Sequence, residues 1–526
     1  MSLSALIFIG SILLVLTVLQ LLILKRTSLA LSVILLLILH SATVWTLIHF
    51  SSLSEIQYGH FLLLPSLAFS LVGYALGSGR QKKGSIWEVV FPAKGKDVHL
   101  DLIRGLAIFG AAGFGKTKSA FAPIIQHCAD QRMAGIFYDY KDFELSEMIN
   151  AFYQKTAHPV YFVAPGRPAL SHRINPIHPD YLKSLNDVNA LAHAFISNLS
   201  YNQRDHTSFF NDAAEAALAG TIWRTKESYP ELCNLPYVTA ILLTKQLDEL
   251  EAYLRESEYA SILAKTFLDS LASDRQIAAV QATLSNALRK IVSPEMFAVF
   301  SGNDFSLALN DTAHPAVMVL VNHPKYDAVF APFLATVAQS ALLQMAERNR
   351  HPSVLLLDEA ATLKIPRMER VPATMRSYQI ATVLGLQDKV QGEILYEEKK
   401  LKAILANLSS KLISHANDPD TARYYERFFE VVNQETRSVS RSTSFLTNSS
   451  SRETLSTKER SKHKAFEFFK LKPGEFFIFD HEGNNRKAQL KMVDYEPIMP
   501  PVIHQESSAD MEERFQRVLR EARELG

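Results

Sequence analysis

The chain has 526 residues, which is long for one domain, so two or three domains are expected. Its 55 Lys and Arg residues nearly balance 54 Asp and Glu residues, which gives a net charge of +1. The overall charge of the protein therefore cannot attract a polyanion, and any surface that binds nucleic acid must be a local basic patch. The two cysteines, Cys128 and Cys233, lack ligand-like spacing, which excludes a disulfide framework and a zinc site.

Residues 1–80 are expected to form a transmembrane anchor. The apolar runs are residues 3–24, 28–50 and 61–77. Runs of about 20 apolar residues can span a bilayer, and the first run lacks the basic start and cleavage site of a signal peptide. Positive charge lies at Lys25–Arg26 and at Arg80, Lys82 and Lys83, so the positive-inside rule predicts three spans with the N-terminus outside. Two spans remain the alternative, because the third run is short.

Residues 110–117 read Gly-Ala-Ala-Gly-Phe-Gly-Lys-Thr, the P-loop pattern, and follow a short apolar run typical of a strand. Gly110, Gly113 and Gly115 allow backbone N–H groups to point at phosphate oxygens. We expect Lys116 to reach the β- and γ-phosphates of ATP and Thr117 to ligate Mg²⁺. A chance Gly-rich turn is the alternative, which the complete motif after a strand disfavours.

A second motif, residues 353–359, is an apolar strand that ends in Asp358 and Glu359. Asp358 is placed to bind the Mg²⁺ at the P-loop, and Glu359 is placed to act as general base on an attacking water. The pattern is weak alone. Together with the P-loop it indicates ATP hydrolysis rather than nucleotide binding alone.

Short apolar runs recur after residue 98, with helical stretches between most of them. The predicted strands are residues 106–109, 135–138, 160–163, 316–321, 354–357, 381–385, 412–414 and 476–480. This alternation predicts an α/β fold, a RecA-like, doubly wound P-loop sheet. Gly110, Asp139, Asp358 and Gln387 fall just beyond strand ends, where such sheets bind ligands.

The nucleotide-binding domain is expected in two parts, residues 84–178 and 310–500. Residues 179–309 are rich in Ala and Leu and predict an inserted all-α domain. Residues 436–461 are dense in Ser and Thr and predict a mobile loop. A strand pair near residues 476–479 and 488–493 should return to the sheet. Residues 501–526 are a C-terminal tail with a short surface helix.

These motifs, in this order, resemble the coupling ATPases of type IV secretion and bacterial conjugation, the TraG/TraD family. The matching segments are Gly110–Thr117, Asp139-Tyr-Lys141, Asn175-Pro176, Leu355–Ala360, Leu384–Gln387 and His415–Arg423. The resemblance covers nearly all of residues 90–500. The chain departs from the family in fitting three spans rather than two, and in having Phe143 where the family has an acidic residue.

The resemblance implies a homohexameric motor, multi-pass in the bacterial inner membrane, with its ATPase domain in the cytoplasm. It implies ATP and Mg²⁺ as cofactors, and a relaxase-bound DNA strand or an effector protein as the substrate brought to a type IV secretion channel. Gln387 would sense the γ-phosphate, or merely cap a strand. Arg376 would act as an arginine finger on a neighbouring subunit; a solvated surface Arg, or Arg367 or Arg370 in that role, are the alternatives.

Three other interpretations compete. A membrane-tethered DNA translocase of the chromosome-segregation type normally carries a C-terminal sequence-reading domain, for which we expect no room here. A scaffold with a vestigial P-loop would not need Lys116, Thr117, Asp358 and Glu359 together. An ATP-powered solute transporter needs more spans. Whether the cargo is DNA or protein stays open; the basic candidates for DNA contact are Arg80, Lys82, Lys83, Arg437, Arg441, Arg452, Lys458 and Arg460.

Overall fold

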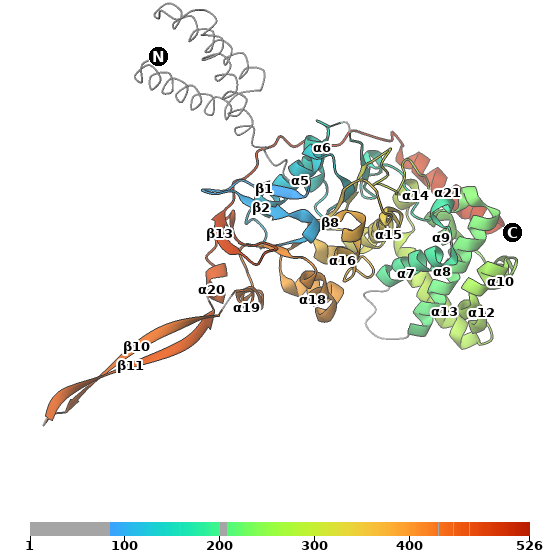
Figure 1. Cartoon of the computed structure of the whole chain (residues 1–526). Coiled ribbons are helices and arrows are strands. Elements are labelled where there is room, and N and C mark those ends of the chain that lie inside the picture. The colour runs from blue at the N-terminus through green and yellow to red at the C-terminus, as the bar shows by residue number, and fades with distance from the viewer. Residues whose placement is uncertain are drawn as a thin grey trace, which may run out of the picture. The chain divides into compact units, whose positions relative to one another are not determined.

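The computed structural model describes residues 85–156, 158–199, 208–429, 431–444, 447–461 and 463–525 (Figure 1). The chain divides into two units, Met1–Ile86 and Trp87–Gly526, and the fold described here is that of the second. The anchor predicted in residues 1–80, with its topology, lies outside the described residues.

The second unit is built on a nine-stranded sheet in the order β13-β12-β9-β3-β8-β7-β4-β6-β5. The strands are β3 (Leu106–Phe109), β4 (Ala134–Asp139), β5 (Val160–Val163), β6 (Val317–Val321), β7 (Ser353–Leu357), β8 (Ile380–Leu386), β9 (Ser410–Ile413), β12 (Glu475–Phe479) and β13 (Asn485–Gln489). Neighbouring strands from β9 to β5 are parallel, whereas β12 and β13 add an antiparallel edge. The eight strands predicted from apolar runs are all present within two residues; the last strand begins at Asn485 rather than at residue 488.

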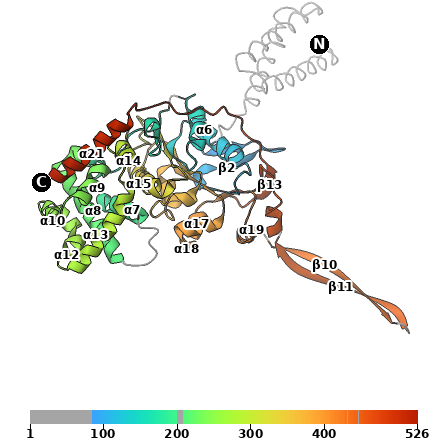
Figure 2. The same cartoon turned by 180° about the vertical axis from the view of Figure 1, so that it is seen from behind.

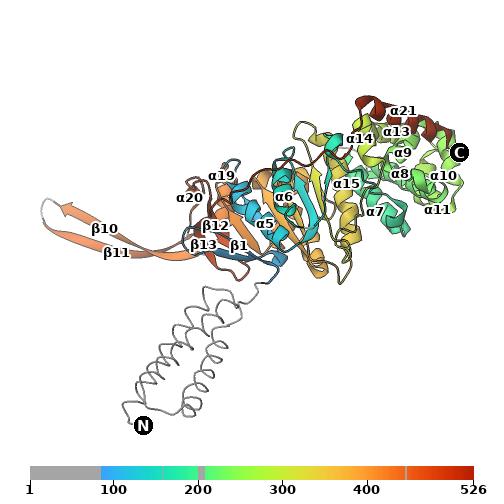
Figure 3. The ribbon, with the colours of Figure 1, turned by 90° about the horizontal axis from the view of Figure 1, so that it is seen from above.

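Helices cover both faces of the sheet, and the central strands β3, β8, β7, β4 and β6 are buried on both sides. Along β7, Val354 and Leu356 belong to one hydrophobic cluster and Leu355 and Leu357 to another. The first cluster is closed by α5 (Ala122–Asp130) and α6 (Glu144–Tyr153), which lie side by side (Figure 3). The second includes α15 (Asp327–Met345). This two-sided burial explains why the strands are continuous apolar runs.

Within the described residues, α15 is the one helix long and apolar enough to cross a membrane, and most of it is buried inside the molecule. It packs on α7 (Leu185–Leu199), and its Phe333 ring meets that of Phe195 at 5.2 Å. Its composition is therefore that of a core helix.

A helical insertion separates β5 from β6, although these two strands are neighbours in the sheet. After α7 its helices are α8 (Ser208–Ser228), α9 (Leu235–Thr244), α10 (Leu247–Arg255), α11 (Glu258–Leu263), α12 (Lys265–Ser270), α13 (Asp274–Leu288) and α14 (Pro294–Phe300). The segment thus leaves and re-enters the sheet at adjacent positions, as an insertion must.

The Ser/Thr-rich segment is not irregular, contrary to the loop expected from its composition. It forms two antiparallel strands, β10 (Val431–Ser444) and β11 (Thr447–Ser461), whose register runs from Val431 opposite Ser461 to Ser444 opposite Thr447 (Figure 1). Two strands satisfy each other's backbone groups without an apolar core, and Thr and Val favour strands. Composition reports the capacity for apolar burial and therefore does not predict this pairing of two strands.

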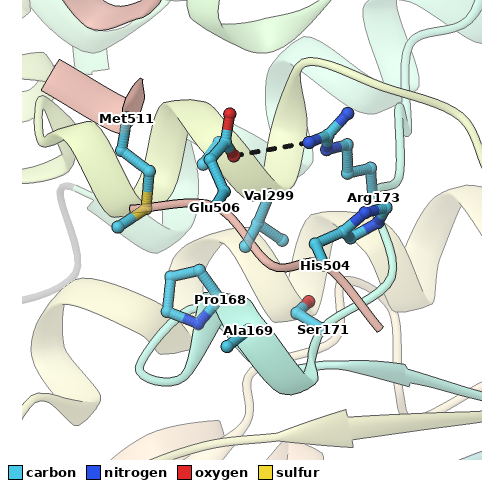
Figure 4. A pocket seen from close by; sticks show the side chains of 9 residues that line it. Pro168, Ala169, Ser171, Arg173, Val299, His504, Glu506 and Met511 are labelled. Atoms are coloured by element: carbon cyan, nitrogen blue, oxygen red, sulfur yellow. Dashed lines mark hydrogen bonds and ion pairs between the residues drawn. The ribbon is translucent and has the colours of Figure 1, made fainter. Parts of the chain in front are cut away.

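The C-terminal segment returns to the helical insertion. Its helix α21 (Ser508–Glu524) packs on α9 and α14 (Figure 2). The Phe515 ring lies edge-on to the Phe297 ring, with centroids 5.0 Å apart. Upstream of α21, Glu506 pairs with Arg173 at 3.3 Å beside a small pocket (Figure 4). The expected surface helix therefore packs on the helical insertion. The Glu506–Arg173 ion pair links the segment before this helix to the chain that follows β5.

Candidate functional site

The glycine-rich loop after β3 makes a tight turn and leads directly into a helix. Lys116–Phe121 form a single wide helical turn that continues as α5. Gly113 and Gly115 have φ values of 81° and 87°, the left-handed region that glycine enters without strain. A Cβ on Gly115 would also lie 3.1 Å from the backbone nitrogen of Gly474. The loop therefore presents the N-terminus of a helix, where backbone N–H groups favour anions.

The glycine-rich loop is held by contacts with His415, in the matching segment His415–Arg423, and with Gly474. The N–H of Ala111 donates to the His415 carbonyl at 3.0 Å, and the Phe114 ring stacks on the His415 ring at 3.8 Å. Gly474 donates its N–H to the Phe114 carbonyl at 3.1 Å. The segment after β9 thus fixes the loop, which gives the His415–Arg423 motif a structural role.

Lys116 is buried, with 9% of its surface exposed. Its Nζ donates to the carbonyl of Gly110 and, at 3.5 Å, to that of Leu386. Burial lowers the pKa of Lys116, while Glu359 and Asp358 act in the opposite direction. A desolvated ammonium whose described partners are neutral carbonyls is suited to a strongly anionic ligand.

The two acids follow β7 at the same edge of the sheet. The N–H of Asp358 donates to the Tyr138 carbonyl at 3.2 Å, which continues the β4–β7 pairing. Burial raises the pKa of Asp358 to about 7, and the carboxylates of Asp139 and Glu359 act in the same direction. Burial also raises the pKa of Glu359, which is 4% exposed. Lys116 lowers the pKa of both acids, but it does not offset the effect of their burial.

This donor set fits Mg²⁺. The ion prefers oxygen ligands and is commonly bound through one or two carboxylates together with substrate phosphates and water. No group of three or more His, Cys, Asp and Glu side chains within the described parts of the chain could hold a metal by itself. An ion beside Asp358 would accordingly need the Thr117 hydroxyl and phosphate oxygens as further ligands.

Gln387 follows β8 and lies against the acidic pair, as its position beyond a strand end predicts. Its N–H donates to Oε1 of Glu359 at 3.4 Å. The next residue, Asp388, caps α17 (Lys389–Tyr396) by accepting the N–H of Gln391 at 2.8 Å, which fixes the chain where it leaves the strand. Lys116, Asp358, Glu359 and Gln387 therefore share one site.

Arg376 is not part of that site within one chain. It lies on an exposed turn, Arg376–Tyr378, that precedes β8, whereas Gln387 follows the same strand. Seven residues of strand at about 3.3 Å each place the two ends roughly 20 Å apart. Arg376 therefore lies beyond the reach of the Lys116 site in its own chain.

Asp139 has a structural environment despite its position beyond β4. Its carboxylate accepts hydrogen bonds from the N–H groups of Lys141 (2.9 Å), Leu145 (3.0 Å) and Ser146 (2.8 Å), and from the Ser146 hydroxyl (2.6 Å). These bonds cap the start of α6. Phe143, in the place of the family's acidic residue, is buried with a φ of 80°.

Three polar residues near Glu359 were not predicted from the sequence, namely Tyr138, Asn322 and Thr362. They are joined by hydrogen bonds across sequence separations of 184 and 224 residues. No local pattern links such distant positions, so only the fold reveals them.

A doubly wound, mainly parallel sheet with a P-loop after β3, and an acidic pair after β7 two strands away, defines a mixed α/β protein of the P-loop NTPase class. The family model for the type IV secretion-system coupling protein DNA-binding domain matches residues 101–467. The chain belongs to this family.

Solved structures of coupling proteins share the fold. The bacterial conjugative coupling protein TrwBdeltaN70, in its unbound form, is similar with a TM-score of 0.58 and 16% identity, over 76% of this chain and 88% of that one. Plasmid coupling protein TrwB in complex with ADP and Mg²⁺ gives 0.60 and 15%, over 77% and 88%. TrwB with the ATP analogue ADPNP gives 0.59 and 14%, over 77% and 89%. No curated protein matches the sequence.

The hydrogen bonds of Asp139 lead to a stability prediction. Asp139→Asn replaces one acceptor oxygen by a donor that faces other donors, so we expect the free energy of unfolding to fall by about 2–3 kcal/mol. The control is Asp142→Asn, whose partner Arg167 has a half-exposed side chain, and it should cost less than about 1 kcal/mol. Thermal unfolding of the full chain in detergent measures both variants; equal melting temperatures would contradict this role of Asp139.

Proposed function

We propose that the chain is a membrane-anchored ATPase that brings a DNA or protein substrate to a type IV secretion or conjugation channel and drives its transfer by ATP hydrolysis. The observation that carries the proposal is the convergence of Lys116, Asp358, Glu359 and Gln387 on one edge of the sheet. Membership of the coupling protein family supports the cargo-transfer part. The anchor expected in residues 1–80 would hold the motor at the bacterial inner membrane with the ATPase domain in the cytoplasm.

In this proposal the P-loop binds the phosphates of ATP. Lys116 exchanges the carbonyls of Gly110 and Leu386 for phosphate oxygens, and the backbone of Gly113 and Gly115 adds N–H donors. Thr117 and Asp358 would hold Mg²⁺, which when bound neutralises phosphate charge. The TrwB complexes with ADP and Mg²⁺ and with ADPNP support this choice of ligands.

Glu359 acts as the general base in this scheme. Its burial raises its pKa, which makes the carboxylate a better proton acceptor for an attacking water. Gln387, bonded to Glu359 through its N–H, is placed to respond to the γ-phosphate. Binding and chemistry therefore depend on different residues.

This division predicts different defects in two variants. Lys116→Ala should weaken ATP binding and abolish turnover. Glu359→Gln should keep ATP binding within about threefold and lower kcat at least about 100-fold, because the amide cannot accept a proton. Titration with a fluorescent ATP analogue and phosphate release by the full chain measure the two quantities. Turnover close to the wild-type rate in Glu359→Gln would overturn the assignment.

We infer that Arg376 acts on the nucleotide of a neighbouring subunit in a hexamer. It is exposed and lies roughly 20 Å along β8 from its own site, so it is available only to another molecule. An arginine finger supplied by a partner is worth about 10³–10⁵ in rate when engaged.

Mixed assemblies test this inference. Arg376→Ala and Glu359→Gln chains should each be inactive alone, but mixing them pairs an intact Glu359 site with an intact Arg376 from the neighbour. Turnover should therefore recover partially, to a maximum at intermediate ratios. A mixture of Arg376→Ala with Lys116→Ala/Arg376→Ala chains is the control without recovery. If turnover at every mixing ratio equals the weighted sum of the rates of the two separate proteins, action between subunits is contradicted.

DNA is the cargo that the family's description favours. Because the net charge is +1, DNA contact must be local. The candidates are Arg80, Lys82 and Lys83 after the anchor, and Arg437, Arg441, Arg452, Lys458 and Arg460 on β10 and β11. A motor that moves any sequence should grip phosphates.

The full chain in nanodiscs should bind single-stranded and duplex DNA without sequence preference, and its affinity should fall at least about 100-fold between roughly 50 and 200 mM salt. Replacing the five basic residues of β10 and β11 with Gln should flatten this salt dependence, whereas replacing their four Arg with Lys should preserve it. Absence of DNA binding at low salt would favour a protein cargo instead.

A further inference from the structure

A chain of hydrogen bonds ends on the backbone of Glu359 and is buried at its Asn322–Tyr138 end. Nδ2 of Asn322 donates to the Tyr138 hydroxyl at 2.8 Å, and Oη of Tyr138 lies 2.9 Å from Oγ1 of Thr362. The Thr362 hydroxyl in turn lies 2.8 Å from the Glu359 carbonyl and donates to it. The reaction proposed above uses none of these three side chains.

The direction of every bond in this chain is determined. Oδ1 of Asn322 accepts the N–H of His323 at 2.8 Å, so the amide nitrogen must face Tyr138. The Thr362 hydroxyl has one hydrogen, which it gives to the Glu359 carbonyl, so it can only accept from Tyr138. The single hydrogen of Tyr138 therefore points to Thr362. Such a chain has one arrangement and resists rotation of any member.

The chain joins three strand ends at the candidate site. Asn322 follows β6, Tyr138 lies in β4, and Glu359 with Thr362 follows β7. The backbone of Asn322 adds to the connection, since its N–H donates to the Asp139 carbonyl at 2.8 Å. The Glu359 carbonyl also accepts the N–H of Thr362 at 3.1 Å, so both donors of Thr362 hold the same oxygen.

Burial makes these bonds costly to lose. Tyr138 is fully buried and Asn322 is 1% exposed, so water cannot replace a missing partner of either. Burial also raises the pKa of Tyr138 well above its usual range, which keeps its hydroxyl protonated and donating. The chain therefore restricts rotation of the backbone at the Glu359 carbonyl.

We propose that Tyr138, Asn322 and Thr362 are positioning residues for hydrolysis: by fixing the Glu359 backbone, they aim its carboxylate at the water that attacks the γ-phosphate. The proposal rests on the proposed role of Glu359 as general base. A small misplacement of a catalytic group lowers the rate of the chemical step without weakening the binding of substrate.

The test uses paired variants of the full chain. Tyr138→Phe and Thr362→Val should each lower kcat for ATP hydrolysis about 10-fold and leave KM within about twofold. Thr362→Ser keeps the hydroxyl and should retain near-normal kcat. Tyr153→Phe is the control for losing a buried hydroxyl, because Tyr153 is fully buried and donates to the Met133 carbonyl at 3.0 Å, at the start of β4. It should leave kcat unchanged.

The outcomes separate this proposal from the proposed function. If Glu359→Gln abolishes turnover while Tyr138→Phe and Thr362→Val hydrolyse ATP normally, positioning is refuted and the ATPase assignment stands. If Tyr153→Phe lowers kcat as much as Tyr138→Phe does, the effect is general destabilisation and the proposal fails. If Glu359→Gln is itself fully active, both fail. In the Glu359→Gln background, Tyr138→Phe should lower the residual kcat no further. A further loss of about 10-fold in the double variant would show that Tyr138 acts independently of Glu359.

Discussion

The structure depends on the parallel register of four neighbouring strands. Phe109 of β3 lies opposite Leu386 of β8, and Leu357 of β7 lies opposite Leu384 of β8 and Tyr138 of β4. Because parallel strands end at a common edge, this register brings the P-loop, the acidic pair and Gln387 together from segments far apart in the chain. A one-residue slip of β7 would turn Leu355 and Leu357 from one hydrophobic cluster into the other, so the clusters that stabilise the sheet also align the site.

That alignment concentrates negative charge at one edge. Asp139 satisfies its carboxylate with four local donors, whereas Asp358 and Glu359 remain poorly compensated and have raised pKa values. Lys116 is buried beside them, with a lowered pKa and neutral carbonyls as partners. Such a site costs stability in the free protein. A magnesium ion and phosphates together supply the charges that both kinds of group lack, so the strain of the free site favours ligand binding.

The sequence predicts the sheet well because two-sided burial leaves a simple signal, a run of apolar residues. It also predicts that Gln387 lies just beyond a strand end, and in the structure Gln387 follows β8 and contacts Glu359. Residues 436–461 were not expected to form strands, because composition reports the lack of a core and not the pairing of two backbones. The docking of α21 on α9 and α14, and the links from Asn322 through Tyr138 to Thr362, join distant segments and need the fold itself.

We propose that this edge of the sheet binds ATP and Mg²⁺ for hydrolysis. A structure of the full chain in nanodiscs with Mg²⁺ and a non-hydrolysable ATP analogue tests this proposal most directly. We expect Nζ of Lys116 to leave the carbonyls of Gly110 and Leu386 and contact the γ-phosphate, with the ion beside Thr117 and Asp358 and a water within reach of Glu359. Nucleotide bound elsewhere, or Lys116 still bonded to both carbonyls with nucleotide present, would contradict the account.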